Sequence, residues 1–301
     1  MVKNILVPLD GSEYSEYAIP HSIHIASIFN ARITLIHIIE QNAPRSIHGQ
    51  YHITNTDEAK KYLEKVVREK YKNTANVGYH IHENGNDNVA RTISLHHEEL
   101  TSDLVVMTTH GRGGLKELIF GNNAQQIINF GNIPVYFVPL GKETAGMTCV
   151  NKIMIPLDGS EDHEPGIEIA SDLAAACGSS INLVFVIPTM NSLKIDKIGI
   201  SQLLPRATEE MLNIAEDEMT TYCMIKKNEL EKKGLDVEAE IYRGDPSKII
   251  TENMEKKDID LIVLGTHGKS GLNAFWSGSI AAKIISRSNT AMLLIPLKQE
   301  L

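Results

Sequence analysis

An internal duplication constrains the fold of this chain more than any other feature of its sequence. Residues 7–13 (VPLDGSE) return 148 positions later, at 155–161, as IPLDGSE. Two further blocks return 157 positions later: residues 109–115 (THGRGGL) at 266–272 as THGKSGL, and residues 132–140 at 289–297. Matched blocks in the same order predict two copies of one domain, with a net insertion between the first and second blocks of the second copy.

The length of the chain agrees with this division. A chain of 301 residues, with 42% hydrophobic and 22% charged side chains, has enough apolar material for two ordinary globular domains. Residues 141–150 are rich in small and polar side chains and predict the linker. We therefore expect domains at 1–140 and 151–301.

Both copies alternate short apolar runs with segments of helical periodicity. The predicted strands are 4–9, 32–39, 77–82, 104–108 and 135–140 in the first copy and 152–157, 181–187, 237–242, 260–264 and 291–297 in the second. Regular alternation of strand and helix implies right-handed crossovers and a parallel sheet. The predicted fold class is α/β: two tandem doubly wound, Rossmann-like domains, each with a five-stranded parallel sheet flanked by helices.

Local signals set several of the expected helix ends. Gly178 and Gly234 follow helical segments and predict their termination. Asp245 and Pro246 predict a helix start, with the Asp as N-cap and the Pro in the first turn. Pro20 lies inside the first helical segment, so that helix should kink or start late.

Composition argues against several classes of protein. The formal net charge is −9, and no basic stretch suggests a nucleic-acid partner. No run reaches the roughly 18 apolar residues of a membrane span, and the N-terminal segment lacks the pattern of a signal peptide, so a cytosolic protein is expected. The cysteines are too few for a disulfide framework or a zinc cluster; they are Cys149, Cys177 and Cys223.

The predicted strand ends carry the candidate ligand-binding residues, because ligands of doubly wound sheets bind at the carboxyl ends of the strands. In the second copy, Asp158 follows the first strand, residues 265–271 follow the fourth, and Gly278-Ser279 opens the last helix. Glycines and a helix N-terminus can form a phosphate cradle, although the same residues also occur as ordinary turns and caps. A P-loop is excluded by Val263 and a Gly-x-Gly-x-x-Gly motif by Lys116, each standing where a glycine is required.

At these residues the sequence resembles the universal stress protein family in its tandem form, over nearly the whole chain. ATP-binding members carry Gly-x2-Gly-x9-Gly-(Ser/Thr), and the second copy matches it at Gly265, Gly268, Gly278 and Ser279. The resemblance also implies the fold, which is similar to that of the adenine-nucleotide α-hydrolases. It implies a nucleotide-binding stress-response or regulatory protein that takes ATP, with Mg²⁺ as the accompanying metal.

The resemblance also implies the roles of individual residues. Asp158, with Pro156 two positions before it, would lie near the adenosine part and would contact any metal. The backbone of Val186 would meet the adenine. The ribose and phosphates would be lined by Gly265, Gly268, Lys269, Gly278, Ser279 and Ile280.

The first copy departs from this pattern. Its aligned positions are Thr108, Gly111, Gly121 and Asn122. Thr108 puts a β-branched side chain where backbone should approach the ligand, and Asn122 replaces the hydroxyl residue. Asp10 is retained. We therefore expect a weak or empty site in the first copy.

Histidines are concentrated in the first copy. His80 and His82 share one face of a predicted strand, and His96 and His97 are adjacent in a predicted helix. A metal site is one interpretation, but exposed polar residues on a sheet rim and a helix are the interpretation that the sequence favours. The His48-x3-His52 spacing falls in a predicted loop.

No catalytic constellation is present in the sequence. ATP binding with at most slow hydrolysis is therefore the leading function, and a nucleotide-independent protein that binds a protein partner or a small ligand is the alternative. An ATP pyrophosphatase would need a Ser-Gly-Gly-x-Asp-Ser loop, which the first strands lack. The resemblance further implies antiparallel pairing of strands 135–140 and 291–297, which gives an intramolecular pseudo-dimer and leaves room for a further homodimer.

Overall fold

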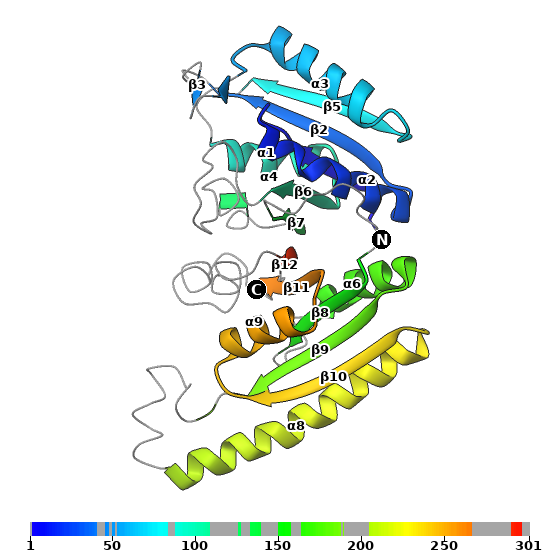
Figure 1. The fold of residues 1–301 in the computed structure, drawn as a ribbon. Coiled ribbons are helices and arrows are strands. Elements are labelled where there is room, and N and C mark those ends of the chain that lie inside the picture. Colours follow the sequence, from blue (N-terminus) through cyan, green and yellow to red (C-terminus); the bar gives the residue numbers. More distant parts are fainter. Residues whose placement is uncertain are drawn as a thin grey trace. The chain divides into compact units, whose positions relative to one another are not determined.

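The computed structural model describes residues 2–40, 46–47, 50–51, 53–83, 88–108, 126–127, 133–139, 150–157, 164–187, 189, 205–266 and 290–296. The chain forms two compact units (Figure 1). The first unit comprises Met1–Thr148 with Thr266–Asn273 and Asn289–Leu301. The second comprises Cys149–Gly265 with Ala274–Ser288.

The first unit is built on a parallel sheet. Its parallel strands, in spatial order, are β5 (Val77–Glu83), β2 (Arg32–Ile39), β1 (Asn4–Pro8), β6 (Leu104–Thr108) and β7 (Val135–Val138). β12 (Ala291–Pro296), from the end of the chain, pairs antiparallel with β7, with Leu293 opposite Tyr136. The antiparallel pairing expected between the final strands of the two copies is therefore present.

Helices cover both faces of this sheet. α1 (Glu13–Glu16), α2 (Ala18–Phe29) and α3 (Thr56–Lys70) lie on one face, where Ser22 of α2 hydrogen-bonds Tyr71 at the end of α3. α4 (Val89–Glu99) packs on the other face of β5. A short hairpin of β3 (Ser46–Ile47) and β4 (Gln50–Tyr51), which the sequence did not predict, lies between β2 and α3 in the chain.

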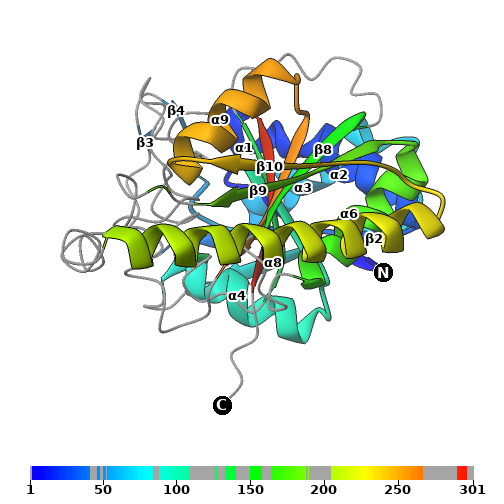
Figure 2. The same ribbon diagram turned by 90° about the horizontal axis from the view of Figure 1, so that it is seen from below.

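The second unit repeats this plan. Its strands, in spatial order, are β10 (Asp236–Arg243), β9 (Ser180–Ile187), β8 (Lys152–Leu157) and β11 (Leu261–Thr266), and all their pairings are parallel. α6 (Glu164–Cys177) packs on β8 and β9, and α8 (Pro205–Lys232) packs on β9 and β10. α9 (Pro246–Lys256) contacts β9. Figure 2 shows α8 as one long continuous helix.

The predicted α/β fold class is confirmed, and the strands begin and end within two residues of the predicted positions. The central strands are apolar runs buried on both faces, as in β1, where Ile5, Leu6 and Val7 are fully buried, whereas the edge strands β5 and β10 are partly exposed. Such continuous burial is typical of parallel sheets covered by helices on both sides.

The local signals also act as predicted. Gly178 and Gly234, which follow α6 and α8, have φ values of 69° and 81°, in the left-handed region that favours glycine. Asp245 caps α9 by accepting a hydrogen bond from the Lys248 N–H at 2.9 Å. Pro20 falls in the first turn of α2, which starts late, after the separate turn α1, so its missing N–H removes no helical hydrogen bond.

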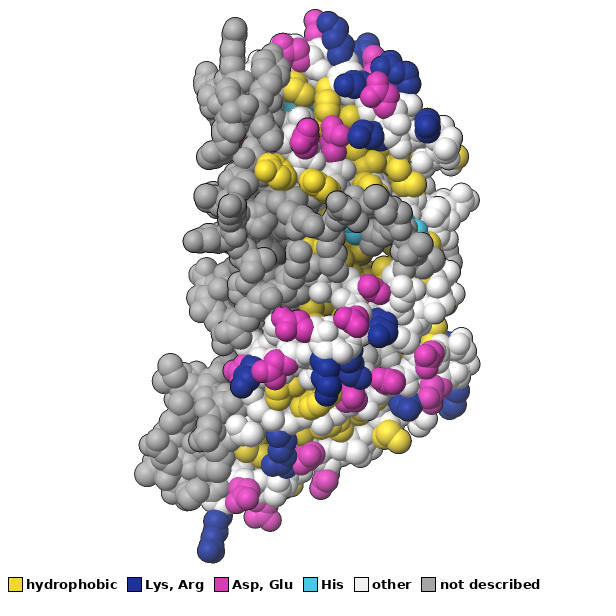
Figure 3. Space-filling model, viewed as in Figure 1, with side chains coloured by type: hydrophobic (Ala, Val, Ile, Leu, Met, Phe, Trp, Pro, Cys, Tyr) yellow, Lys and Arg dark blue, Asp and Glu magenta, His cyan; other side chains and the backbone are white. Residues whose placement is uncertain are grey.

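The surface of the described residues mixes charges of both signs. Figure 3 shows acidic and basic side chains interspersed with hydrophobic ones on one face. On α8, Lys226 and Lys227 pair with Glu229 and Glu231 at 3.2 and 3.6 Å. Among the described helices, none is both long enough and apolar enough to cross a membrane.

Candidate functional site

Three of the predicted site residues lie at the carboxyl ends of adjacent strands in the second unit. Pro156 is near the end of β8, Val186 is near the end of β9, and Gly265 is near the end of β11. All three are half-buried, whereas the residues next to them on the strands are mostly buried. This edge of the sheet is where a doubly wound domain binds its ligand.

The other predicted site residues lie outside the described part of the chain. They are Asp158, Gly268, Lys269, Gly278, Ser279 and Ile280. In the first copy, the same holds for Gly111, Gly121 and Asn122.

Strand register identifies equivalent positions in the two units. Leu104 pairs with Ile5 as Leu261 pairs with Ile153, so Thr108, four residues further along β6, is equivalent to Gly265 on β11. Thr108 is buried, with 5% of its surface exposed. The second unit therefore presents the half-buried backbone of Gly265 where the first unit has a buried β-branched side chain.

Asp10 follows β1 in the first unit and belongs to a hydrogen-bonded turn. Its Oδ1 accepts from the Ser12 N–H at 2.9 Å and from the Ser12 hydroxyl at 2.6 Å. Ser12 in turn caps α1 through the Ser15 N–H, and Gly11 between them has a φ of 82°. One oxygen of this carboxylate is thus engaged in holding the turn that connects strand and helix.

Buried polar side chains lie beside this turn. The Leu9 carbonyl accepts a hydrogen bond from His37 Nδ1 at 2.7 Å, and the His37 ring packs edge-on against Tyr62. Burial, together with the charge of Glu16, which accepts the Tyr62 hydroxyl hydrogen bond, raises the pKa of Tyr62. Phe185 occupies the position of His37 in the second unit, so the same strand face is polar in one unit and apolar in the other.

A charged network lies on β10 of the second unit. Lys257 Nζ lies 2.8 Å from Glu240 and 3.0 Å from Glu238, and Asn182 donates to Glu240 at 3.1 Å. Burial acts to raise the pKa of Glu240, but the hydrogen bonds from Lys257 and Asn182 outweigh it, and the pKa is lowered. This network links β10 to Asn182 of β9 and to Lys257, which follows α9.

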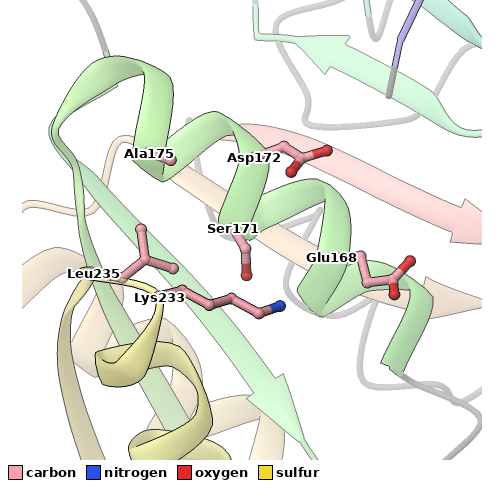
Figure 4. Close-up of a pocket in the computed structure, with 6 residues that line it drawn as sticks. All are labelled: Glu168, Ser171, Asp172, Ala175, Lys233 and Leu235. Atoms are coloured by element: carbon pink, nitrogen blue, oxygen red, sulfur yellow. The ribbon is translucent and has the colours of Figure 1, made fainter.

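A shallow pocket of about 240 Å³ lies between α6 and the end of α8 (Figure 4). The lining residues are Glu168, Ser171, Asp172, Ala175, Lys233 and Leu235. Lys233 and Leu235 immediately precede β10, so the pocket lies at the amino end of that strand. It is therefore on the edge of the sheet opposite to the predicted ligand site, and we assign it no role in ligand binding.

Three histidines of the first unit come together. His80 and His82 of β5 and His96 of α4 have ligand atoms within 4.8 Å of one another. His96 is only 6% exposed, so the interpretation that the sequence favoured, exposed polar residues, is wrong for this residue. The spacing of His80 and His82 was visible in the sequence, but the packing of His96 onto them is a tertiary contact that no local pattern encodes.

Comparison with known proteins places both repeats in one family. The model of the Universal stress protein family matches residues 1–139 and 150–296. A universal stress protein of Mycolicibacterium smegmatis is 24% identical over 302 residues, covering 97% of this chain and 96% of that protein. Universal stress protein MJ0531 of Methanocaldococcus jannaschii is 29% identical over 154 residues, covering 50% of this chain and 84% of that protein.

Solved structures share the fold. The crystal structure of a universal stress protein from Archaeoglobus fulgidus aligns with a TM-score of 0.67 at 15% identity, covering 98% of this chain and 97% of that one. Two other solved universal stress proteins hold a nucleotide: one is in complex with cAMP, and one, from A. fulgidus, is in complex with dAMP. They cover 49% and 50% of this chain, with TM-scores of 0.32 and 0.34. Since the family model covers both repeats nearly end to end, the chain belongs to the universal stress protein family.

Proposed function

We propose that this chain is a cytosolic regulatory protein that binds one adenine nucleotide, ATP, in its second repeat. The observation that carries the proposal is the complete motif Gly265-x2-Gly268-x9-Gly278-Ser279, which begins at the carboxyl end of β11. Glycines at these positions allow backbone N–H groups to approach phosphate oxygens closely.

The described strand ends fit such a ligand. Pro156, Val186 and Gly265 are half-buried on three adjacent strands, with no bulky side chain at Gly265. Asp158, two residues after Pro156, is the residue that would contact the adenosine part and a Mg²⁺ that accompanies ATP. Lys269 would add a positive charge beside the phosphates, and Ile280 would follow Ser279 at the start of the last predicted helix.

The first repeat is proposed to bind nucleotide weakly or not at all. Thr108 is buried at the position of Gly265, and its β-branched side chain occupies space that the second repeat leaves to backbone. In addition, Asp10 is already engaged by Ser12.

Matched variants test the assignment. Gly278→Val should weaken ATP binding by well over tenfold, because a side chain there would occupy space near the phosphates. Asp158→Ala should weaken ATP and AMP comparably, because it removes a contact to the part that both nucleotides share. The equivalent first-repeat changes, Gly121→Val and Asp10→Ala, are the controls and should leave affinity nearly unchanged.

Calorimetric titration with ATP and AMP gives these affinities, and melting curves exclude unfolding as their cause. Loss of ATP binding in the first-repeat variants alone would reverse the assignment. Mass spectrometry of small molecules released from the purified, gently denatured protein would show whether a nucleotide co-purifies. Binding to a protein partner without any nucleotide affinity would instead support the alternative function.

We further propose that the two repeats act as an intramolecular pseudo-dimer. Support comes from the antiparallel pairing of β7 with β12, which covers a strand edge that would otherwise be open.

A further inference from the structure

The three-histidine cluster of the first unit is built by two elements that cross at one edge strand. β5 is the last strand of its sheet in the described residues, and His80 and His82 point to the same face of it because they are two residues apart. The centroid of the His96 ring, from α4, lies 4.7 Å from that of His80 and 4.5 Å from that of His82. The His96 ring therefore contacts both other imidazoles.

Both ring nitrogens of His96 have a close neighbour. Its Nε2 lies 2.7 Å from Nδ1 of His82, so these two nitrogens share a single proton. Its Nδ1 lies 2.7 Å from Oε2 of Glu99, one helical turn further along α4. A carboxylate behind a histidine is the arrangement that orients a metal-binding imidazole and makes its other nitrogen a better ligand.

His80 completes the cluster with a nitrogen that the described residues leave unsatisfied. Its Nε2 is buried and has no hydrogen-bond partner among them. A buried polar atom without a partner costs free energy, so such an atom in a folded protein requires an explanation. A cation held between the three rings would supply the missing partner.

The second unit provides an internal comparison. His80 pairs with Ile36 and His82 with Ile38, as Glu240 pairs with Val184 and Tyr242 with Val186, so the two pairs of residues are equivalent. His96 is eight residues beyond the helix cap Asn88, as Asn253 is eight beyond the cap Asp245. The second unit thus has Glu, Tyr and Asn at the three histidine positions, and there the Tyr242 hydroxyl donates to Asn253 at 3.0 Å.

This comparison separates the requirements of the fold from those of a ligand. The same crossing of strand and helix forms in the second unit. There the equivalent residues use the hydrogen bond from Tyr242 to Asn253 and the ion pair of Glu240 with Lys257, which follows α9. Three histidines are therefore not needed to build it.

We propose that His80, His82 and His96 form a Zn²⁺-binding site in the first unit, with Glu99 orienting His96. Three histidine nitrogens are a known ligand set for zinc sites that keep a fourth position open for water or a small ligand. Tetrahedral Zn–N bonds of about 2.0–2.1 Å put ligand nitrogens roughly 3.4 Å apart. His82 and His96 must therefore separate by about 0.7 Å when Zn²⁺ replaces the shared proton, which small side-chain rotations accomplish.

Titration of the full-length, metal-free protein with Zn²⁺ in the absence of nucleotide tests this site independently of ATP binding. We expect one Zn²⁺ per chain to bind in the first unit. Co²⁺ in its place should give the intense visible absorption of a tetrahedral site. Zn²⁺ should also shift the imidazole ¹⁵N resonances of three of the twelve histidines. This last readout needs no variant.

The matched variant carries the residues of the second unit. His82→Tyr/His96→Asn restores the hydrogen bond seen between Tyr242 and Asn253, and it should fold while losing Zn²⁺ affinity by more than 100-fold. Glu99→Gln should weaken binding about tenfold, through the orientation of His96. His24→Gln, on α2, is the control and should leave the Zn²⁺ affinity unchanged.

Two results would overturn the proposal. One is the absence of any shifted histidine resonance at saturating Zn²⁺ in the wild-type protein. The other is Zn²⁺ affinity that survives undiminished in the double variant. Unfolding of the double variant would leave the decision to the wild-type resonances.

Discussion

At the scale of single residues, the two repeats differ at positions that their shared fold makes equivalent. In the first unit, Thr108, His37 and His96 occupy the positions that Gly265, Phe185 and Asn253 occupy in the second unit. Each change keeps the strand or helix while altering what its side chain can bind. The repeats have therefore kept one architecture and acquired different chemistry at their strand ends and at one sheet edge.

Gly244 should be more sensitive to substitution than Gly178. Gly244 has a φ of 151°, and a Cβ there would come within 2.7 Å of Cδ1 of Ile249. Gly178 has a φ of 69° and open space around the same position. Gly244→Ala should cost about 2–3 kcal/mol of unfolding free energy, against about 1 kcal/mol for the matched control Gly178→Ala. Urea unfolding measures both, and equal costs would contradict this reading of the turn.

His24 should make the protein less stable in mild acid. Burial lowers its pKa in the folded state below the value near 6.5 of an unfolded chain. The unfolded state therefore takes up more protons as the pH falls through 6.5, so this stability is present above pH 6.5 and lost below it.

Unfolding free energies measured from pH 7.5 to 5 should decrease less steeply for His24→Gln than for the wild type. Ser27→Ala, one turn further along α2, is the control and should keep the wild-type slope. An unchanged slope in His24→Gln would show that this histidine does not contribute.

At the scale of elements, an aspartate clasp recurs in both units. Asp103, just before β6, accepts hydrogen bonds from the N–H groups of Lys3 and Asn4 at 2.7 and 2.9 Å. Asp260, just before β11, does the same for Asn151 and Lys152 at 2.9 and 3.1 Å. In each unit one carboxylate thus ties the start of the first strand to the start of its neighbour.

Asp103→Ala and Asp260→Ala should each destabilise the protein by about 1–2 kcal/mol, because each leaves two N–H groups without their charged acceptor. Asp217→Ala, an exposed position on α8, is the control and should change stability by less than about 0.5 kcal/mol. Chemical denaturation of the three variants decides the question. A clasp without energetic value would make all three alike.

The sequence predicted elements well where the signal is local. Apolar runs located the ten main strands, and Asp245, Gly178, Gly234 and Pro20 located helix ends. It did not reveal the aspartate clasps or the packing of His96 on His82, because those contacts join segments that are distant in the chain or on different elements. The hairpin of β3 and β4 was missed because two-residue strands carry no periodicity.

The sequence predicted the nucleotide site only from the spacing of its residues relative to the predicted strands and within the family motif. Pro156, Val186 and Gly265 could be placed at strand ends because each follows or ends an apolar run. The roles given to the remaining residues come from the family motif, and they stay predictions.

At the scale of the whole molecule, the boundary between the two repeats in the sequence differs from the boundary between the two compact units. β12 comes from the end of the second repeat, yet it pairs with β7 and belongs to the first compact unit. Its residues are apolar and buried, as are those of β7. The last strand of the chain is thus an integral part of the first unit's sheet.

If this pairing makes the chain an intramolecular pseudo-dimer, both repeats should tumble together in solution. NMR relaxation should then give one rotational correlation time for amides of β2 and β9 alike, of the length expected for the whole chain. Two distinct, shorter correlation times would contradict the pseudo-dimer.

The most direct test of the central claim is the stoichiometry of ATP binding. Calorimetric titration of the full-length protein should give about one ATP per chain. Gly265→Thr, which copies the first repeat's Thr108, should reduce that affinity by more than tenfold, a loss above about 1.4 kcal/mol. Thr108→Gly should leave the original site intact. Two equal tight sites, or one site that Gly265→Thr leaves unchanged, would contradict the account.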